Sequence, residues 1–286
     1  MKLFLDSGAF SADSKGAPID IYEYIEFIKK NKKHLEVWAN LDVIGDAKAT
    51  WKNQEIMEKA GVGGIPVYHI EDDIKYLYRC LDYPYFALGG IAGKGSSEKR
   101  RLHFLDMCFD IICDKNGHPK NKVHGFGLAS PKYVFRYPWY SFDSSSWVSY
   151  GRFGIVILPA KRGGKFVYDK APIKIFVSSV SPRKGEDGQH FQTLSKQEQR
   201  SFLDYLESKN VKFGKSTFFT YDMKHTLTSN QRFANKSKLE IEEVNEIGVT
   251  NDNMTRDFVN YCFYVDMALE ASRTEIIFKR KNQMLF

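Results

Sequence analysis

Two aspartates stand at the ends of predicted strands, in surroundings that suit nucleophilic attack and proton transfer. Asp6 lies in LDSG and Asp143 in FDSSSW, so each follows apolar residues and precedes a serine. When two carboxylates converge on one pocket, one can attack an anomeric carbon while the other donates and accepts the proton of the leaving group. A single aspartate before serine or glycine more often caps a turn or helix. The pair predicts retaining glycosyl transfer if the fold brings both acids together.

Two more polar side chains follow other predicted strands. Asp42, in ANLDVIGD, could pair with the ring N–H groups of a purine-like base, cap a helix or bind a metal. His69, the last residue of PVYH, could form a hydrogen bond to a ligand or have a structural role in the core. Both positions lie where parallel α/β folds build their sites, at the carboxyl ends of strands.

Two glycine-containing segments also follow predicted strands. In LGGIAGKGSS (88–97), the backbone N–H groups around Gly89 and Gly90 could cradle an anion or edge a flat ligand, although the segment does not match the P-loop rule. In HGFGLASP (124–131), Phe126 could stack on a ligand that lies against Gly127, and no nucleophile-elbow pattern is present. These segments predict a binding site for a planar or anionic group.

The charge balance favours a polyanionic partner. Lys and Arg outnumber Asp and Glu by 42 to 35, which gives a net charge of +7 and a pI near 9.0. Basic residues gather in KRGGK (161–165), SPRKGED (181–187) and NQRFANKSK (230–238), where they could follow phosphates or simply be solvated loops. The candidate phosphate contacts are Lys161, Arg162, Lys165, Arg183 and Lys184.

The elements that must position these residues alternate through the first half of the chain. Short apolar runs predict strands over 2–5, 36–41, 64–70, 85–91, 122–128 and 139–144. Amphipathic segments predict helices over 19–31, 49–61, 72–83, 96–113 and 130–137. This repetition predicts a parallel sheet with helices outside it, as a (β/α) barrel or a doubly wound sheet.

The alternation breaks near residue 150. Strands are expected over 154–159 and 174–179, flanking a basic hairpin or loop, and helices over 195–210 and 255–272. The polar stretch 222–256 has no clear pattern. We expect one domain over 1–286, with a basic insertion around 150–190.

Composition excludes several classes. No apolar run reaches the roughly eighteen residues of a membrane span, and MKLFLDSG is too short in its apolar part for a signal peptide. The four cysteines show neither C-x-x-C spacing nor a zinc-like cluster with histidine. We therefore expect a cytoplasmic protein with reduced thiols, no structural metal and no membrane partner.

Five segments together resemble a known family. DSGAFS (6–11) resembles the DSGGFQ signature of the tRNA-guanine transglycosylases, ALGGIAGKG (87–95) their GGLAVGE-type loop, and HGFGLASP their M-G-x-G-x-P turn. SFDSSSW (141–147) falls where that family carries its nucleophilic aspartate, and ANLDVIGD (39–46) where it carries a base-recognising one. The five occur in the family's order, which is more specific than any one of them.

The resemblance implies a (β/α)8 barrel, with insertions in the second half, that exchanges guanine for a 7-deazaguanine in nucleic acid without a cofactor. By motif, Asp143 would attack C1′ and Asp6 would move the protons of the leaving and entering bases. The implied contacts to the base are Ser7, Asp42, Gly89 and Gly90.

The chain also departs from the family pattern. Ala9 and Ser11 replace glycine and glutamine of DSGGFQ, and the C-x-C-x-x-C zinc site is absent. In these departures the chain resembles the branch of the family, often encoded by phages or genomic islands, that modifies DNA. A phage-encoded member would act in the host cytoplasm. DNA is therefore the favoured substrate and tRNA the alternative, with accessory proteins and the 7-substituent left open.

Two other functions use the same residues. A base-excising N-glycosidase or nucleoside-processing enzyme would employ both acids but let water resolve the intermediate. A catalytically silent nucleic-acid-binding protein would need neither acid, and carboxylates facing a polyanion would disfavour binding.

Overall fold

The computed structural model describes residues 3–91, 97–181, 189–221 and 225–280. Packing divides the chain into two compact units, which are described separately. Unit 1 comprises residues 1–129, 133–144 and 276–286, and unit 2 comprises 130–132 and 145–275. Whether the two units fold as one domain, as expected from the sequence, stays a prediction.

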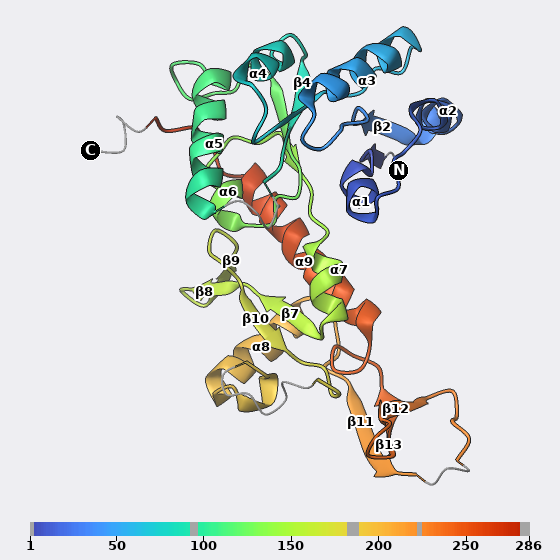
Figure 1. Cartoon of the computed structure of the whole chain (residues 1–286). Coiled ribbons are helices and arrows are strands. Elements are labelled where there is room, and N and C mark those ends of the chain that lie inside the picture. Colours follow the sequence, from blue (N-terminus) through green and yellow to red (C-terminus); the bar gives the residue numbers. More distant parts are fainter. Residues whose placement is uncertain (1–2, 92–96, 182–188, 222–224, 281–286) are drawn as a thin grey trace. The chain divides into compact units, whose positions relative to one another are not determined.

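Unit 1 is built on short parallel strands (Figure 1). They pair in the order of the chain, in a two-stranded and a four-stranded sheet, with no reversal of order. An isolated parallel bridge between Ala39 and Ile65 links the end of the second strand to the third. The strands are β1 (Leu3–Leu5), β2 (Leu35–Trp38), β3 (Val67–His69), β4 (Tyr85–Gly89), β5 (Lys122–Gly125) and β6 (Ser141–Phe142).

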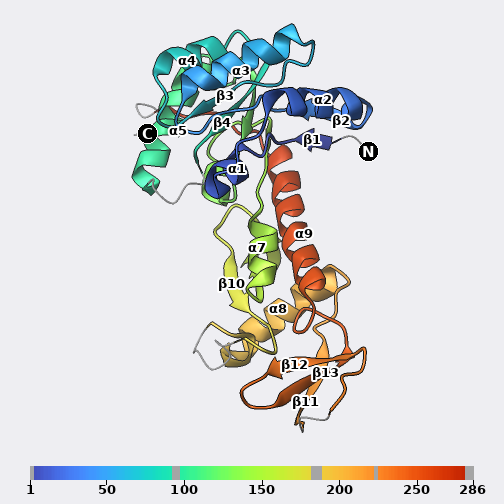
Figure 2. The ribbon, with the colours of Figure 1, turned by 45° about the vertical axis from the view of Figure 1, so that its right-hand side comes forward.

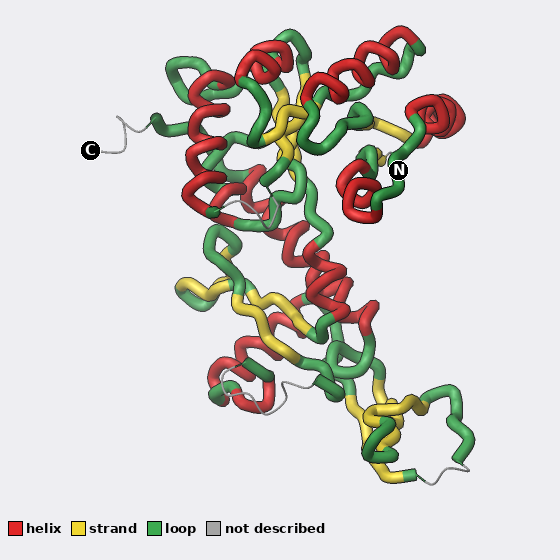
Figure 3. The backbone as a smooth tube through the Cα atoms, in the orientation of Figure 1, coloured by secondary structure: helices red, strands yellow, loops and turns green. Residues whose placement is uncertain are grey.

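Helices connect these strands, as the strand and helix colours of Figure 3 show. Side-chain caps begin four of them: Asp20, Asp46, Asp73 and Ser97 each accept hydrogen bonds from N–H groups of the first turn. The expected helices are all present, as α2 (Ile21–Asn31), α3 (Ala47–Lys59), α4 (Ile74–Cys80), α5 (Glu98–Ile112) and α6 (Pro131–Val134). The sequence did not predict α1 (Ala9–Lys15) or the short 3-10 helix Lys32–His34.

Two apolar layers flank the first strands. Ala39, Ile65, Val67 and Ala87 form one buried cluster, with Phe126 packed against it. A second cluster joins the buried side of α2 and α3 to residues of the β2 region, with Tyr24, Ile28, Leu35, Leu41 and Met57 among its members. In β3 and β4, burial of nearly every residue explains why these strands are apolar runs rather than alternating ones. An α/β fold with parallel strands and helices is therefore confirmed.

A segment that follows unit 2 in the chain completes unit 1. Phe278 stacks on Tyr137, with ring centroids 6.0 Å apart, and packs against Phe109. Its backbone N–H donates to the carbonyl oxygen of Gly117 over 3.0 Å. Arg280 Nε donates to Asp110 Oδ1 over 2.5 Å. Unit 1 is thus discontinuous in sequence.

Unit 2 centres on an antiparallel pair, β7 (Ile155–Leu158) and β10 (Ile173–Phe176), as expected. The long helix α9 (Asn253–Ser272) also belongs to this unit (Figure 2). Its Asn260 side chain accepts a hydrogen bond from Ile157 N–H and donates one to the Ile155 carbonyl, both in β7. The basic stretch between the strands is a hairpin of β8 (Ala160–Arg162) and β9 (Lys165–Val167). The remaining helices are α7 (Ser146–Arg152), the 3-10 helix Phe191–Thr193 and α8 (Lys196–Ser208).

The stretch 222–256, for which the sequence showed no clear pattern, contributes two strands to a three-stranded antiparallel sheet. Its strands are β11 (Lys215–Thr220), β12 (Gln231–Asn235) and β13 (Glu240–Glu246), with β13 in the centre. Glu242 of β13 is fully buried, where it accepts from Ser179 Oγ and pairs with Arg232. Because the central strand carries a buried acid, its sequence lacks the alternation of apolar and polar residues from which a strand is ordinarily predicted.

Among the described residues, no helix combines the length and the apolar character needed to cross a membrane. Cys80, Cys108 and Cys113 are buried free thiols, and Cys262 is a partly buried one. Burial raises the pKa of the Cys113 thiol to about 12, which keeps it protonated and unreactive.

Candidate active site

The end of β1 delivers Ser7 to Asp42, across the first strand pair of unit 1. Ser7 Oγ donates to Asp42 Oδ1 over 2.7 Å and accepts the Ala9 N–H over 3.1 Å. Ser7 is buried, and the second bond begins α1 directly after the turn at Gly8. The structure therefore brings together two residues that the sequence assigned to base binding, and bonds them to each other.

Asp42 also faces a histidine held by a second acid. His69 Nε2 lies 3.1 Å from Asp42 Oδ2, and His69 Nδ1 lies 3.7 Å from Asp72 Oδ2. The same Asp72 oxygen accepts the His69 backbone N–H over 3.0 Å. Burial alone would lower the pKa of His69, but the two carboxylates outweigh it and raise that pKa to about 9. The ring is an imidazolium at neutral pH.

Gly89, at the end of β4, has no side chain, and the His69 imidazolium occupies the space that a Cβ would fill. A Cβ at position 89 would lie 2.5 Å from His69 Cδ2 and 2.8 Å from His69 Nε2. Gly90 follows in the left-handed region, with φ +75°. Gly89 and Gly90 were expected to bind a base through their backbone groups, and that role stays a prediction. The structure shows instead that Gly89 packs against His69.

Asp143 follows β6 and is held by the glycine turn after β5. Gly127 N–H donates to Asp143 Oδ1 over 2.7 Å. Gly127 has φ +67°, a conformation that glycine adopts without strain. The Asp143 side chain is 45% exposed. Gly127 therefore positions the expected nucleophile, a role that the sequence did not predict for it.

A buried histidine lies beside Asp143. His124 Nε2 is 3.6 Å from Asp143 Oδ1, and His124 Nδ1 is 2.7 Å from Ser141 Oγ. The ring stacks on Phe4 with centroids 4.4 Å apart and contacts Phe126 edge to face at 4.6 Å. Phe126, expected to stack on a ligand, thus uses its ring against protein, and ligand stacking stays a prediction.

Asp6 shares this region with both other acids. Partial loss of hydration raises the pKa of Asp6; a hydrogen bond from Gly8 N–H at 3.5 Å opposes that shift, and the negative charges of Asp143 and Asp42 add to it. The side chain stays open to solvent. A carboxyl group with a raised pKa between two carboxylates is suited to hold and release a proton.

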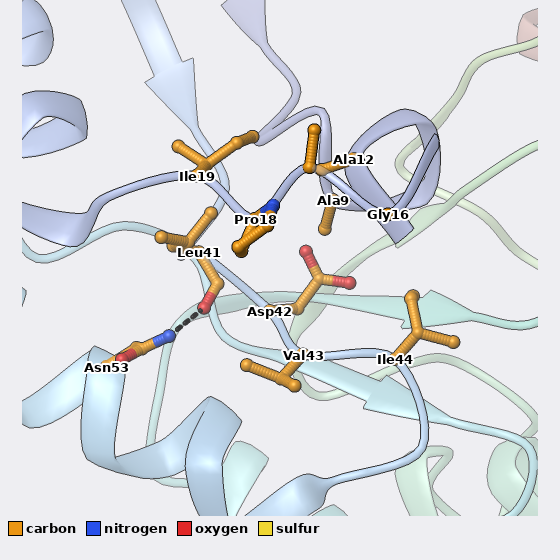
Figure 4. A pocket seen from close by; sticks show the side chains of 11 residues that line it. Ala9, Ala12, Gly16, Pro18, Ile19, Leu41, Asp42, Val43, Ile44 and Asn53 are labelled. Carbon is orange, nitrogen blue, oxygen red and sulfur yellow. Dashed lines mark hydrogen bonds between the residues drawn. The ribbon is translucent and has the colours of Figure 1, made fainter. Parts of the chain in front are cut away.

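A pocket of about 290 Å³ opens beside Asp42 (Figure 4). Its lining is mostly apolar and comes from α1, the segment after it, the loop after β2 and Asn53 of α3, with the Asp42 carboxylate directed into it. Asn53 Nδ2 donates to the Leu41 carbonyl over 2.8 Å and so fixes that loop. The volume lies at the lower end of the roughly 300–1,000 Å³ that small-molecule sites occupy.

The expected phosphate contacts fall in unit 2 and differ in their pairing. Lys161 Nζ lies 2.9 Å from Asp204 Oδ2, and Arg162 pairs with Asp169 at 3.1 Å. Lys165 is exposed at the hairpin. Arg183 and Lys184 lie outside the described residues. Two of the basic side chains are therefore partly neutralised within the protein.

Sequence reasoning missed four residues of this site: Asp72, His124, Ser141 and Tyr85, whose Oη lies 2.6 Å from Ser141 Oγ. Asp72 could have been found from its spacing, three residues after a strand-end histidine, and His124 from its place directly before the G-F-G turn. Within the described ranges, no group of three or more His, Cys, Asp or Glu side chains is arranged to hold a metal ion. In comparisons with known proteins, no family model, no curated protein and no solved structure matches this chain.

Proposed function

We propose that this protein is a base-exchange glycosyltransferase that replaces guanine by a 7-deazaguanine derivative in nucleic acid, with DNA favoured over tRNA. The observation that carries the proposal is that Asp6, Asp42 and Asp143 meet in one region: Asp42 is bonded to Ser7, the neighbour of Asp6, Asp143 is held by Gly127, and burial together with the charges of both acids raises the pKa of Asp6. Residues that lie far apart in the chain thus supply a nucleophile and a proton carrier to one region.

In the first half of the proposed reaction, Asp143 attacks C1′ of the target nucleotide. Both contacts to Asp143, from Gly127 and from the His124 side, involve Oδ1, so Oδ2 is the attacking atom. An Oδ2–C1′ bond forms as the C1′–N9 bond breaks, and the electron pair of that bond leaves with the base. Asp6 gives its proton to the departing guanine, which its raised pKa favours.

In the second half, the entering base reverses these steps. Asp6 takes the N9 proton of the 7-deazaguanine, N9 bonds to C1′, and the Oδ2–C1′ bond breaks to return the Asp143 carboxylate. Two inversions at C1′ retain its configuration. One N-glycosidic bond replaces another, so the exchange needs no cofactor or nucleotide hydrolysis.

Ser7 and Asp42 are the proposed contacts to the base. A carboxylate has about four lone-pair sites, so Asp42 can keep its bonds to Ser7 and His69 and still accept ring N–H groups of guanine. The backbone at Gly89 and Gly90 would then edge the base. The apolar pocket beside Asp42 offers adjoining space for part of the ligand.

The architecture we propose for catalysis is a (β/α)8 barrel. Pairing of the strands in chain order supports a barrel over a doubly wound sheet, in which the order reverses at the binding crevice. The target base must leave its stack for C1′ to be reached, at a cost of a few kcal/mol. Basic residues of unit 2, Lys165 among them, are the proposed phosphate contacts.

The decisive experiment supplies a labelled 7-deazaguanine with either DNA or tRNA, then digests the polymer to nucleosides. The expected result is a labelled nucleoside from an intact strand with the wild-type protein and none with Asp143→Ala, which should still bind the polymer. Asp114→Ala, at an exposed turn of the same unit, is the matched control and should keep full activity. Unchanged incorporation by Asp143→Ala would overturn the mechanism, and abasic sites instead of exchange would identify an N-glycosidase.

A further inference from the structure

His124 has a buried nitrogen that its own surroundings do not satisfy. The residue is 2% exposed, and in the described structure Nε2 has no hydrogen-bond partner. Buried polar atoms are nearly always bonded, so such an atom calls for an explanation. The nearest charged group is Asp143, whose Oδ1 lies 3.6 Å away, just outside hydrogen-bond distance.

The hydrogen bond at the other ring nitrogen, Nδ1, determines whether Nε2 carries a proton or a lone pair. Tyr85 Oη lies 2.6 Å from Ser141 Oγ, which lies 2.7 Å from His124 Nδ1. If Tyr85 donates to Ser141 and Ser141 donates to Nδ1, the ring proton resides on Nε2 and points an N–H group at Asp143. The opposite tautomer would direct a lone pair at a carboxylate, which only accepts hydrogen bonds. The first arrangement is therefore the favoured one.

Neighbouring strands hold this chain of contacts in place. Ser141 is the register partner of His124 in the parallel pair β5–β6, and Ala87 is its partner in β4–β5. The Phe4 ring stacks on the imidazole at 19° and restricts its rotation. The imidazole therefore has a fixed position and a fixed direction toward the acid.

We propose that His124 is a positioning residue that donates, together with Gly127 N–H, to Asp143 Oδ1 during base exchange. This inference rests on the proposed function, because it assigns a role toward the nucleophile. Two donors on one oxygen orient the carboxylate so that Oδ2 faces C1′. They also stabilise the free carboxylate relative to its ester, and thereby favour Asp143 as the leaving group in the second half of the reaction.

The test compares variants that keep or remove the Nε2 donor. His124→Phe keeps a ring against Phe4 without the donor, whereas His124→Gln places an amide N–H near the Nε2 position. Each protein is incubated with the polymer that accepts label in the exchange assay, quenched in denaturant, and run on a denaturing gel to quantify the covalent complex. The measurement is repeated with added guanine, and kcat and KM for guanine exchange are determined in parallel.

With His124→Phe, we expect the covalent fraction to rise and kcat to fall, each by about tenfold. This is the change expected from the loss of one hydrogen bond to a charged acceptor. KM for the polymer should stay the same, and His124→Gln should restore most of kcat. His103→Phe, at an exposed histidine of α5, controls for the substitution itself. If His124→Phe does not fold by thermal melting, His124→Asn, whose amide is one methylene shorter, replaces it in the comparison with His124→Gln.

The outcomes separate the two proposals. Equal behaviour of His124→Phe and the wild-type protein, or equal loss in both His124 variants, would show that the ring only packs, and would overturn the positioning role. A wild-type protein that forms neither covalent complex nor exchanged product would overturn the proposed function itself.

Discussion

His69 Nε2 lies 3.1 Å from Asp42 Oδ2, and both side chains are only 11% exposed. The pair brings a positive charge next to the acid that faces the pocket. The two charges therefore offset each other in a poorly hydrated place, where an unpaired charge would be costly.

The first prediction concerns the pH dependence of this pair. The pKa of His69 is raised from 6.5 to about 9 in the folded state, so its stabilising effect is complete below about 6.5 and is lost as pH rises through 9. We expect the wild-type protein to exceed His69→Gln in free energy of unfolding by a few kcal/mol near pH 6, on the order of 3 for a shift of this size. Urea denaturation at pH 6, 7.5 and 9.5 measures the difference, which should shrink with pH. A difference independent of pH would contradict the imidazolium assignment.

The second prediction concerns Asp6, the proposed proton carrier. Because the charge of Asp143 raises the pKa of Asp6, Asp143→Asn should lower that pKa toward 3.8. Carboxyl carbon NMR titration of Asp6 measures the change directly. The control Asp114→Asn should leave the Asp6 titration where it is. A titration of Asp6 that does not move in Asp143→Asn would mean that the two carboxylates do not sense each other.

The third prediction concerns the space beside His69. In Gly89→Ala, the new methyl group would lie 2.5 Å from His69 Cδ2, so the ring must move away from Asp42. We expect a loss of about 1–3 kcal/mol in the free energy of unfolding. The comparison variant is Gly63→Ala, whose methyl group would lie 2.9 Å from Glu58 Cγ and not against His69. Denaturation of both variants provides the measurement, and similar stabilities would refute the close packing.

The fourth prediction concerns the basic hairpin of unit 2. Lys165→Gln should weaken nucleic-acid binding and reduce the slope of log K against log salt by about 1, the value of one phosphate contact. Lys161→Gln should change the slope less, because Lys161 already pairs with Asp204 at 2.9 Å. Fluorescence anisotropy with labelled DNA over a salt series measures both. Identical slopes for Lys165→Gln and the wild-type protein would remove the hairpin from the binding surface.

Sequence patterns predicted most of unit 1 because apolar runs and amphipathic segments alternate there without interruption. They missed α1, whose short length gives little helical periodicity, and which begins where Ala9 N–H bonds Ser7 Oγ. They also left β11, β12 and β13 unassigned; in β12 and β13, the buried pair of Glu242 with Arg232 interrupts the apolar alternation.

The candidate site could be predicted in part. Asp6, Ser7, Asp42 and Asp143 follow from motif and strand-end position. The partnership of His124 with Ser141 and Tyr85 depends on the register between three parallel strands, which hydropathy does not encode.

The discontinuity of unit 1 has a consequence for synthesis on the ribosome. Strands that pair with their predecessors can associate as they emerge, so the acids could be gathered early. The Phe278 segment, which contacts Gly117, Phe109 and Tyr137, is translated only after all of unit 2. The nascent chain would thus lack the Phe278 contacts of unit 1 throughout the translation of unit 2.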